Sequence, residues 1–279
     1  MLTSVEDIRA AVRDRYGRFA ADGGVAEACC ASQEPAEVSF AVDHGLYGSE
    51  ELASVPDAAR KLSRGCGNPV GFAGVTAGEV VVDVGCGGGI DVILAALLVG
   101  DRGSVTGVDM APEMIERARA AVIQAGVAER TSLVVADMAR TGIADASVDV
   151  IISNCVINLD PEKEAVYREI VRMLRPGGRI AISDIVLREP IDSALSARFR
   201  ASWPGCVGGA VPEADYLRMI RLAGLTEPTV IARHTLGEQE LMSMSCCPGE
   251  NYVPAPPAGE LAAVRGKVTS IKFTATKPH

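Results

Sequence analysis

The spacing of hydrophobic residues predicts an alternation of strands and helices through the middle of the chain. Short apolar runs typical of buried strands lie at 80–84, 104–108, 132–136, 148–153 and 179–186. Helical spacing lies between them at 90–98, 112–125 and 162–174, and Arg175-Pro176-Gly177-Gly178 is expected to break the chain after the last helix. Because parallel strands need crossover helices, this order predicts a doubly wound, Rossmann-like α/β sheet.

The flanking regions differ from this core. Ser4 and Asp7 have capping-box spacing and precede apolar residues at helical intervals, and short helices are expected at 56–62 and 68–75. Residues 190–214 break the alternation before a helix at 213–223 and possible closing strands at 229–233 and 270–275. The predicted regions are a helical N-terminal lid with a cysteine pair (1–64), a Rossmann-like core (65–189), and an insertion with closing strands and a C-terminal tail (190–279).

Composition narrows the functional classes. The 279-residue chain is 48% hydrophobic and carries a net charge of −9, which argues against nucleic-acid binding because phosphates require clustered Lys and Arg. The longest apolar run, Val92–Val99, is too short to span a bilayer, and the acidic N-terminus is unlike a signal peptide. We therefore expect a cytoplasmic monomer with no nucleic-acid or membrane partner.

A glycine-rich loop follows the first predicted strand and opens the next helix. The segment runs Asp83-Val84-Gly85-Cys86-Gly87-Gly88-Gly89, where glycines let a cofactor approach the backbone and the helix N–H groups. Its G-x-G-x-G spacing differs from the G-x-G-x-x-G of dinucleotide-binding proteins. Such a loop is weak evidence alone, so the ends of the following strands are needed to interpret it.

Acidic residues stand at two of those strand ends. Asp109 is placed to accept hydrogen bonds from ribose hydroxyls and Asp137 from an adenine amino group, although each is also suited to capping the next helix. Residues 79–187 resemble class I S-adenosylmethionine-dependent methyltransferases. This resemblance implies that S-adenosylmethionine is the cofactor, with Met110 and Met138 sandwiching the adenine. The expected cofactor-binding residues are Asp83, Gly85, Cys86, Gly87, Gly89, Asp109, Met110, Asp137, Met138 and Asn154.

The cysteines form a second candidate site. The chain has eight cysteines and three histidines, with no C-x-x-C pair that would indicate zinc, so free thiols are expected. Cys155 follows the fourth strand, Cys206 lies in the insertion after the fifth, and Cys66 precedes a helix N-terminus that favours its thiolate. Any one of them suits a small buried apolar residue, but three in loops at one sheet edge favour a soft-ion site.

Three segments around these thiols resemble the arsenite methyltransferase family. They are Arg64-Gly65-Cys66-Gly67-Asn68-Pro69, Ile151-Ile152-Ser153-Asn154-Cys155-Val156-Ile157-Asn158-Leu159 and Gly205-Cys206-Val207-Gly208-Gly209-Ala210. The resemblance extends over nearly the whole chain, although Arg64 replaces a usually apolar residue. It implies that Cys66, Cys155 and Cys206 bind trivalent arsenic as thiolates, and that Cys29 or Cys30 forms a disulfide with a site cysteine during turnover.

The implied reaction is methyl transfer from S-adenosylmethionine to arsenite or methylarsenite, free or as thiol adducts, for detoxification. Glutathione or thioredoxin is then expected to restore the thiols. No general base is required, so Asp184 near the fifth strand's end is expected to be structural. Two alternatives stay open: methylation of a small organic metabolite, and sequestration of metalloids. The pair Cys246-Cys247 is either an arsenic-capturing tail or a dispensable surface loop.

Overall fold

The computed structural model describes residues 4–24, 46–192, 207–237, 240–241 and 264–279. The described residues contain a seven-stranded sheet of order β3-β2-β1-β4-β5-β7-β6, in which β7 runs antiparallel to its neighbours. The strands are β1 (Val80–Val84), β2 (Ser104–Asp109), β3 (Thr131–Val135), β4 (Val148–Asn154), β5 (Leu174–Leu187), β6 (Thr229–Thr235) and β7 (Val268–Thr276). This architecture confirms the predicted doubly wound α/β fold.

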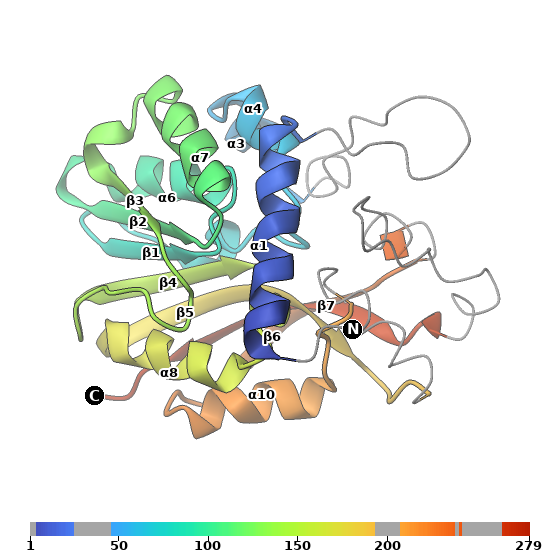
Figure 1. The fold of residues 1–279 in the computed structure, drawn as a ribbon. Coiled ribbons are helices and arrows are strands. Elements are labelled where there is room, and N and C mark those ends of the chain that lie inside the picture. The colour runs from blue at the N-terminus through green and yellow to red at the C-terminus, as the bar shows by residue number, and fades with distance from the viewer. Residues whose placement is uncertain (1–3, 25–45, 193–206, 238–239, 242–263) are drawn as a thin grey trace.

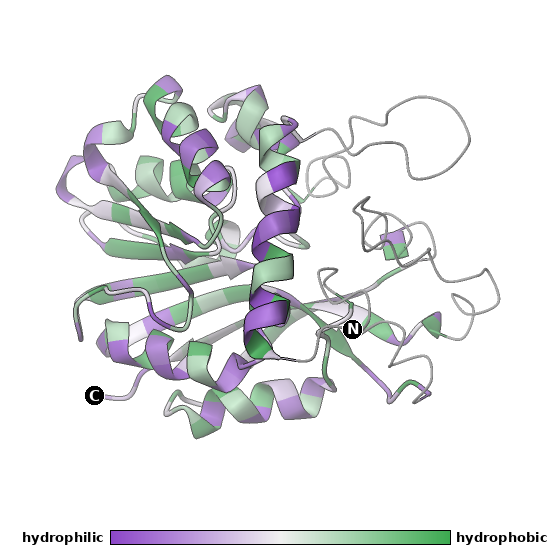
Figure 2. Ribbon diagram, viewed as in Figure 1, coloured by the Kyte–Doolittle hydropathy of each residue, from purple (hydrophilic) through white to green (hydrophobic). Residues whose placement is uncertain are grey.

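Helices cover both faces of the sheet, with α6 and α7 on one and α8 and α10 on the other (Figure 1). The helices are α1 (Val5–Ala21), α3 (Ser49–Ala53), α4 (Asp57–Lys61), α5 (Val70–Ala73), α6 (Ile90–Val99), α7 (Pro112–Gln124), α8 (Lys163–Met173) and α10 (Glu213–Leu222). Hydrophobic residues concentrate along the central strands between these layers (Figure 2). None of the described helices has the length and apolar character needed to cross a bilayer.

Helix α1 crosses the arrowhead ends of the parallel strands (Figure 1). Its predicted capping box is present: the Asp7 backbone N–H donates to Ser4 Oγ at 3.0 Å, and the Ser4 N–H donates to the Asp7 carboxylate at 3.2 Å. Arg9 fixes the helix to the core by donating to both carboxylate oxygens of Asp160, at 3.1 and 3.2 Å. The helix therefore lies over the edge of the sheet at which open α/β folds bind ligands.

Two predicted boundaries are wrong, and both have a local cause. Arg175–Gly178 does not break the chain; it lies inside β5, where Leu174 pairs with Val148 and Arg179 with Val150. Residues 175–178 have no paired residue in β4 and form a bulge, and a bulge can accommodate a proline and two glycines. The predicted helix at 68–75 is shortened to α5 because Gly74 ends it in a left-handed conformation, with φ of +60°. Helix α3 was not predicted.

The strand order places a ligand crevice between β1 and β4. Strand β1 pairs with β2 on one side and with β4 on the other, so successive connections leave it in opposite directions. At such a switch point the loops after the two strands diverge and leave a crevice at their carboxyl ends. The glycine-rich loop follows β1, Asn154 is the last residue of β4, and Cys155 follows it. The predicted cofactor site and the predicted thiol site therefore meet at this crevice.

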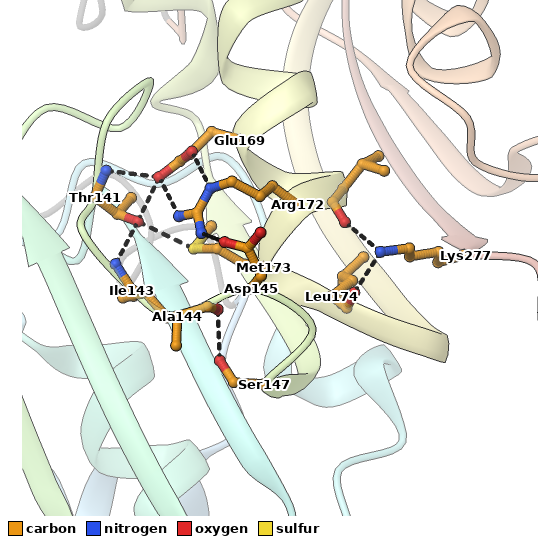
Figure 3. Close-up of polar contacts among 11 residues, drawn as sticks. Thr141, Ile143, Ala144, Asp145, Ser147, Glu169, Arg172, Met173, Leu174 and Lys277 are labelled. Atoms are coloured by element: carbon orange, nitrogen blue, oxygen red, sulfur yellow. Dashed lines mark hydrogen bonds and ion pairs between the residues drawn. The ribbon is translucent and has the colours of Figure 1, made fainter.

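At the opposite end of the sheet, a polar network fixes the long loop between β3 and β4 (Figure 3). Glu169 on α8 accepts hydrogen bonds from the Thr141 backbone N–H at 2.8 Å and the Thr141 hydroxyl at 2.7 Å. Arg172 donates twice to the same carboxylate, both times at 2.8 Å, and also pairs with Asp145. Hydrogen bonds from Arg172 lower the pKa of Glu169 from 4.5 to about 2.

Replacing Glu169 by glutamine should lower the free energy of unfolding at pH 7 by about 1–2 kcal/mol. Because the pKa of Glu169 is depressed in the folded protein, its stabilisation is complete above pH 4.5 and is lost as the pH falls towards 2. The difference in unfolding free energy between Glu169→Gln and wild type, measured by urea titration, should therefore shrink as the pH is lowered from 4.5 to about 2. Glu116→Gln, at an exposed position of α7, is the control. A difference independent of pH would contradict the assignment.

Candidate active site

A pocket of about 820 Å³ opens at the carboxyl ends of the central strands. Its walls include the glycine-rich loop after β1, Asp109 and Met110 at the end of β2, and Asn154 and Cys155 at the end of β4. Val12 and Tyr16 of α1 close one side. The concave shape and mixed polar and apolar lining are typical of a site that encloses a small organic molecule.

The glycines of the loop are required by its backbone geometry. Gly85, Gly87 and Gly89 have φ values of +77°, +50° and +89°, which disfavour any residue with a side chain. A Cβ atom on Gly85 would also collide with Val156, whereas one on Gly87 would meet no atom within 4 Å. The loop is therefore packed tightly at its start and leaves free space beside Gly87, which lines the pocket.

Asp109 lies just before α7, as one of its two suggested roles requires, and it also lines the pocket. Its carboxylate accepts hydrogen bonds from the backbone N–H groups of Gly87 and Ala111, both at 2.9 Å. Ala111 is the N-cap of α7, so Asp109 joins that helix to the glycine-rich loop. Burial raises the pKa of Asp109 above its ordinary value, although these hydrogen bonds favour its ionised form. The acid lines the pocket and still has carboxylate lone pairs available to a ligand.

The structure brings most of the expected cofactor-binding residues to the pocket. Those that line it are Gly85, Cys86, Gly87, Asp109, Met110, Met138 and Asn154. Asp83, Gly89 and Asp137 lie outside this lining. Asp137 pairs with Arg9 at 3.3 Å and accepts from the Ala139 N–H at 2.7 Å. Asp83 is 1% exposed, and burial together with the charges of Asp91 and Asp109 raises its pKa well above the ordinary value.

Two of the three expected arsenic ligands lie together beside the pocket. Cys66 and Cys155 are both buried in one apolar cluster, which also contains Val207, the residue after Cys206. Cys155 lines the pocket itself and has a φ of +62°, a strained conformation for a residue with a side chain. Cys29, Cys30, Cys206, Cys246 and Cys247 lie outside the described residues. Within the described part of the chain, no three metal-ligating side chains gather around one position.

The glycines on either side of Cys66 allow its loop to pack closely against the sheet. A Cβ atom on Gly65 would collide with the Asn154 carboxamide, and one on Gly67 would collide with the Ser183 hydroxyl. The Asn154 Oδ1 atom accepts from the backbone N–H groups of Cys66 and Gly67 at 3.0 and 3.2 Å. The Gly-Cys-Gly sequence is therefore explained by two close approaches, one on each side of the thiol.

Tyr47 and Asp91 belong to this site, although neither was among the expected site residues. The Tyr47 hydroxyl donates to the Asp91 carboxylate at 3.0 Å, and Asn154 Nδ2 donates to it at 3.1 Å. Burial raises the pKa of Asp91 to about 6. One signal could have revealed Asp91: it is the sole charged residue in the ten-residue apolar run of α6.

A second buried network supports the loop that follows Cys155. Asp184 accepts from the Tyr216 hydroxyl at 2.7 Å and from the Asn158 backbone N–H at 3.1 Å. Lys163 donates to the Asn158 carbonyl at 3.1 Å, and a Cβ atom on Gly209 would collide with that carbonyl. Burial raises the pKa of Asp184 to about 6 and lowers that of Lys163 to about 8. These contacts give Asp184 the structural role expected of it.

Comparison with known proteins agrees with this arrangement. A methyltransferase domain family matches residues 75–224. The arsenite methyltransferase of Halobacterium salinarum is 41% identical over 78% of this chain and 57% of its own length, and that of Aquipseudomonas alcaligenes is 38% identical over 54% and 45%. CrArsM, an arsenic(III) S-adenosylmethionine methyltransferase from Chlamydomonas reinhardtii, is similar in structure with a TM-score of 0.67 and 30% identity, covering 82% of this chain and 72% of that one.

The chain belongs to the arsenic(III) S-adenosylmethionine methyltransferase family. The expected family and its cofactor, S-adenosylmethionine, are thereby confirmed. The chain spans about half the length of the curated arsenite methyltransferases that it matches. For a member of this family, the pocket fits its cofactor because a left-handed glycine loop, a carboxylate at the end of β2 and two methionines converge on it.

Proposed function

We propose that this methyltransferase transfers methyl groups from S-adenosylmethionine to trivalent arsenic held by the thiolates of Cys66, Cys155 and Cys206. The observation that carries the proposal is the position of Cys155. This residue lines the cofactor pocket and also packs in one buried cluster with Cys66 and with Val207, the neighbour of Cys206. Arsenite and methylarsenite, free or as thiol adducts, are the proposed substrates, and their methylation would detoxify arsenic.

The residue types suit this chemistry. Trivalent arsenic is soft and thiophilic, so three thiolates hold it while leaving its lone pair directed outward. Bound S-adenosylmethionine supplies an electrophilic methyl group on a sulfonium. The arsenic lone pair forms the new As–C bond, and the electrons of the broken C–S bond pass to sulfur. Because no proton leaves the nucleophile, the thiols need only hold the arsenic close to the methyl group and in line with it.

The proposed cofactor contacts follow the order of the strands. Gly85, Cys86, Gly87 and Gly89 form the loop that admits the cofactor, and Asp109 takes the ribose hydroxyls. Met110 and Met138 enclose the adenine, and Asp137 takes its amino group. The hydrogen bonds of Asp109 to Gly87 and Ala111 support its assignment because they fix the carboxylate at the pocket wall. Asp83 is buried in β1, directly before the loop, and its cofactor-binding role stays a prediction.

The N-terminal cysteines are proposed to take part in redox turnover. Methyl transfer converts the arsenic lone pair into a bond and leaves the arsenic formally pentavalent. Two thiols, one of them Cys29 or Cys30 and the other Cys66, would return two electrons to arsenic and form a disulfide. Described residues on both sides of 25–45 support this: Arg64 donates to the Gly24 carbonyl at 3.4 Å, and Tyr47 bonds to the Asp91–Asn154 pair beside the Cys66 loop.

Turnover is therefore expected to stop after about one cycle without an added reductant. Glutathione or thioredoxin should restore it by exchange with the disulfide, since a thiolate attack regenerates both cysteines. The measurement is methylated arsenic formed per enzyme, with and without the reductant. Undiminished multiple turnover in a reductant-free reaction would contradict the redox role of Cys29 or Cys30.

The remaining assignments extend this function. Residues 1–64 are proposed as a lid, 65–189 as the S-adenosylmethionine-binding core, and 190–279 as the region that contributes the arsenic ligand Cys206. A reducing compartment keeps such thiols active, so we propose a cytoplasmic enzyme whose disulfide is reduced by thioredoxin or glutathione. The proposed oligomeric state is a monomer. The pair Cys246-Cys247 is a candidate for arsenic capture.

The decisive test is product analysis of the full chain with arsenite, S-adenosylmethionine and reductant, by chromatography with mass detection. We expect methylarsenic species that accumulate with time. Methylation of a small organic acceptor that survives alkylation of Cys66 and Cys155 would instead favour the alternative methyltransferase activity. Arsenite binding without any methylated product would favour sequestration.

A further inference from the structure

The side chain of Asn154 makes an unusually complete set of contacts at the end of β4. Its Oδ1 atom accepts from the backbone N–H groups of Cys66 at 3.0 Å and Gly67 at 3.2 Å. Its Nδ2 atom lies 2.8 Å from the Gly67 carbonyl, 3.0 Å from the Tyr47 hydroxyl and 3.1 Å from the Asp91 carboxylate. Both ends of one carboxamide are thus used to bind protein groups.

These contacts hold the backbone of Cys66 on one side, and β7 holds it on the other. The Cys66 carbonyl accepts a hydrogen bond from the Ser270 hydroxyl at 3.0 Å, while its N–H is bound by Asn154. The loop cannot shift without breaking one of these bonds, because Gly65 and Gly67 already lie against Asn154 and Ser183. The Asn154 side chain therefore helps to fix the backbone from which the Cys66 thiol projects.

Asn154 also precedes the second thiol directly. Cys155 has its strained φ of +62° and donates its N–H to the Ser183 carbonyl at 2.8 Å, so its backbone is fixed where β4 meets β5. One residue is thus bonded through the chain to Cys155 and through its side chain to Cys66. The two segments are 88 residues apart in sequence, and their side chains pack in one cluster.

We propose that Asn154 is a positioning residue that sets the spacing between the Cys66 and Cys155 thiols, with Tyr47 and Asp91 holding its carboxamide in orientation. This inference rests on the proposed function and refines the expectation that Asn154 binds the cofactor. The donors and the acceptor of the Asn154 amide all bind protein groups, so the amide is not needed as a cofactor ligand. Replacing Asn154 should therefore affect mainly the arsenic site. A bidentate clamp of this kind preorganises ligands before the substrate arrives.

The test compares Asn154→Ala and Asn154→Asp with wild type in the full chain. Alanine removes every contact, whereas aspartate keeps the acceptor for Cys66 and Gly67 but loses the donors and places a carboxylate against Asp91. Alkylation of Cys66, read by peptide mass spectrometry against Cys86 in the same sample, should be faster by about tenfold or more in the alanine variant. The aspartate variant should be intermediate.

Two further readouts separate positioning from cofactor binding. The KM for arsenite should rise in both variants, more than the KM for methylarsenite, while the Kd for S-adenosylmethionine stays unchanged. Thr141→Val is the matched control, because it removes a part-buried hydrogen bond to Glu169 at the far end of the sheet (Figure 3) and should leave Cys66 labelling unaltered.

Loss of S-adenosylmethionine affinity with unaltered Cys66 labelling would overturn the proposal and make Asn154 a cofactor ligand. Equal acceleration of Cys66 labelling in Thr141→Val would also overturn it, since general loosening would then explain the effect. If wild-type protein yields no methylated arsenic, the proposed function fails, but the labelling and cofactor-binding measurements still decide the role of Asn154. Should the alanine variant fail to fold, the aspartate variant supplies the same comparison.

Discussion

Replacing Asp109 by alanine is expected to weaken S-adenosylmethionine binding by about 2–4 kcal/mol, roughly 30- to 1,000-fold in Kd. The carboxylate is placed to accept charge-assisted hydrogen bonds from both ribose hydroxyls. It also orders the pocket before binding, because it holds the Gly87 N–H at 2.9 Å and the Ala111 N–H at 2.9 Å. Alanine loses the ligand bonds and leaves these two donors without their carboxylate partner. Calorimetric titration of the full chain measures the effect.

Two further variants distinguish ligand contact from support of the loop. Asp109→Asn keeps an acceptor for one backbone N–H but loses the charge, so its Kd should lie between those of wild type and the alanine variant. Asp101→Ala, at an exposed position before β2, should bind as wild type does. Unchanged affinity in Asp109→Ala would remove Asp109 from the cofactor site, and a large loss of thermal stability would assign it to the fold instead.

The fold was predictable because its signals are local. Each strand of the parallel core is a short apolar run, and each crossover helix has its own apolar periodicity, so the order of elements follows from neighbouring residues. The capping box of α1 depends on two side chains three residues apart, and it forms as expected. The glycine-rich loop lies between β1 and α6 as expected, and Gly85, Gly87 and Gly89 adopt left-handed backbone there. The expected family and cofactor followed from these motifs together with the cysteine segments.

The parts that escaped prediction depend on contacts between distant residues. Tyr47 meets Asp91 across 44 positions, and Asn154 meets Tyr47 across 107. No periodicity in the sequence encodes such a pairing; only the sheet order brings these side chains to one edge. The break expected at Arg175–Gly178 failed for the same reason, because pairing with β4 retains this segment as a bulge despite its local preference.

Asp137 is a site residue whose main contact is also made by a residue distant in sequence. Its position at the end of β3 suggested a contact with adenine, but the structure places Arg9 of α1 against its carboxylate at 3.3 Å. Arg9 also pairs with Asp160, so α1 is tied to the loops after two different strands. The role of Asp137 at the adenine therefore stays a prediction, and any contact with the cofactor would have to share this carboxylate with α1.

The largest expected effect is at the thiols. Cys155→Ser should abolish methylation of both arsenite and methylarsenite, because Cys155 is the described arsenic-site thiol that lines the cofactor pocket. Cys206→Ser should do the same. Cys66 lies in the same cluster but outside the pocket lining, so we expect it to be the ligand farther from the methyl donor. Since a methylated arsenic has only two positions left for thiolates, Cys66→Ser should lose activity on arsenite and retain the first methyl transfer to methylarsenite, which precedes the redox step.

The matched control is Cys86→Ser, which changes a thiol in the same pocket that is not assigned to arsenic. Burial, with the nearby charges of Asp109 and Asp83, raises the pKa of Cys86 well above its ordinary value, so this thiol stays neutral and is a poor arsenic ligand. Its serine variant should keep most activity on both substrates. Single-turnover rates of the four variants on arsenite and methylarsenite measure these differences. Full activity of Cys155→Ser on either substrate would overturn the site, whereas loss of both activities in Cys66→Ser would overturn only the distinction between the substrates and would place Cys66 beside Cys155 at every step.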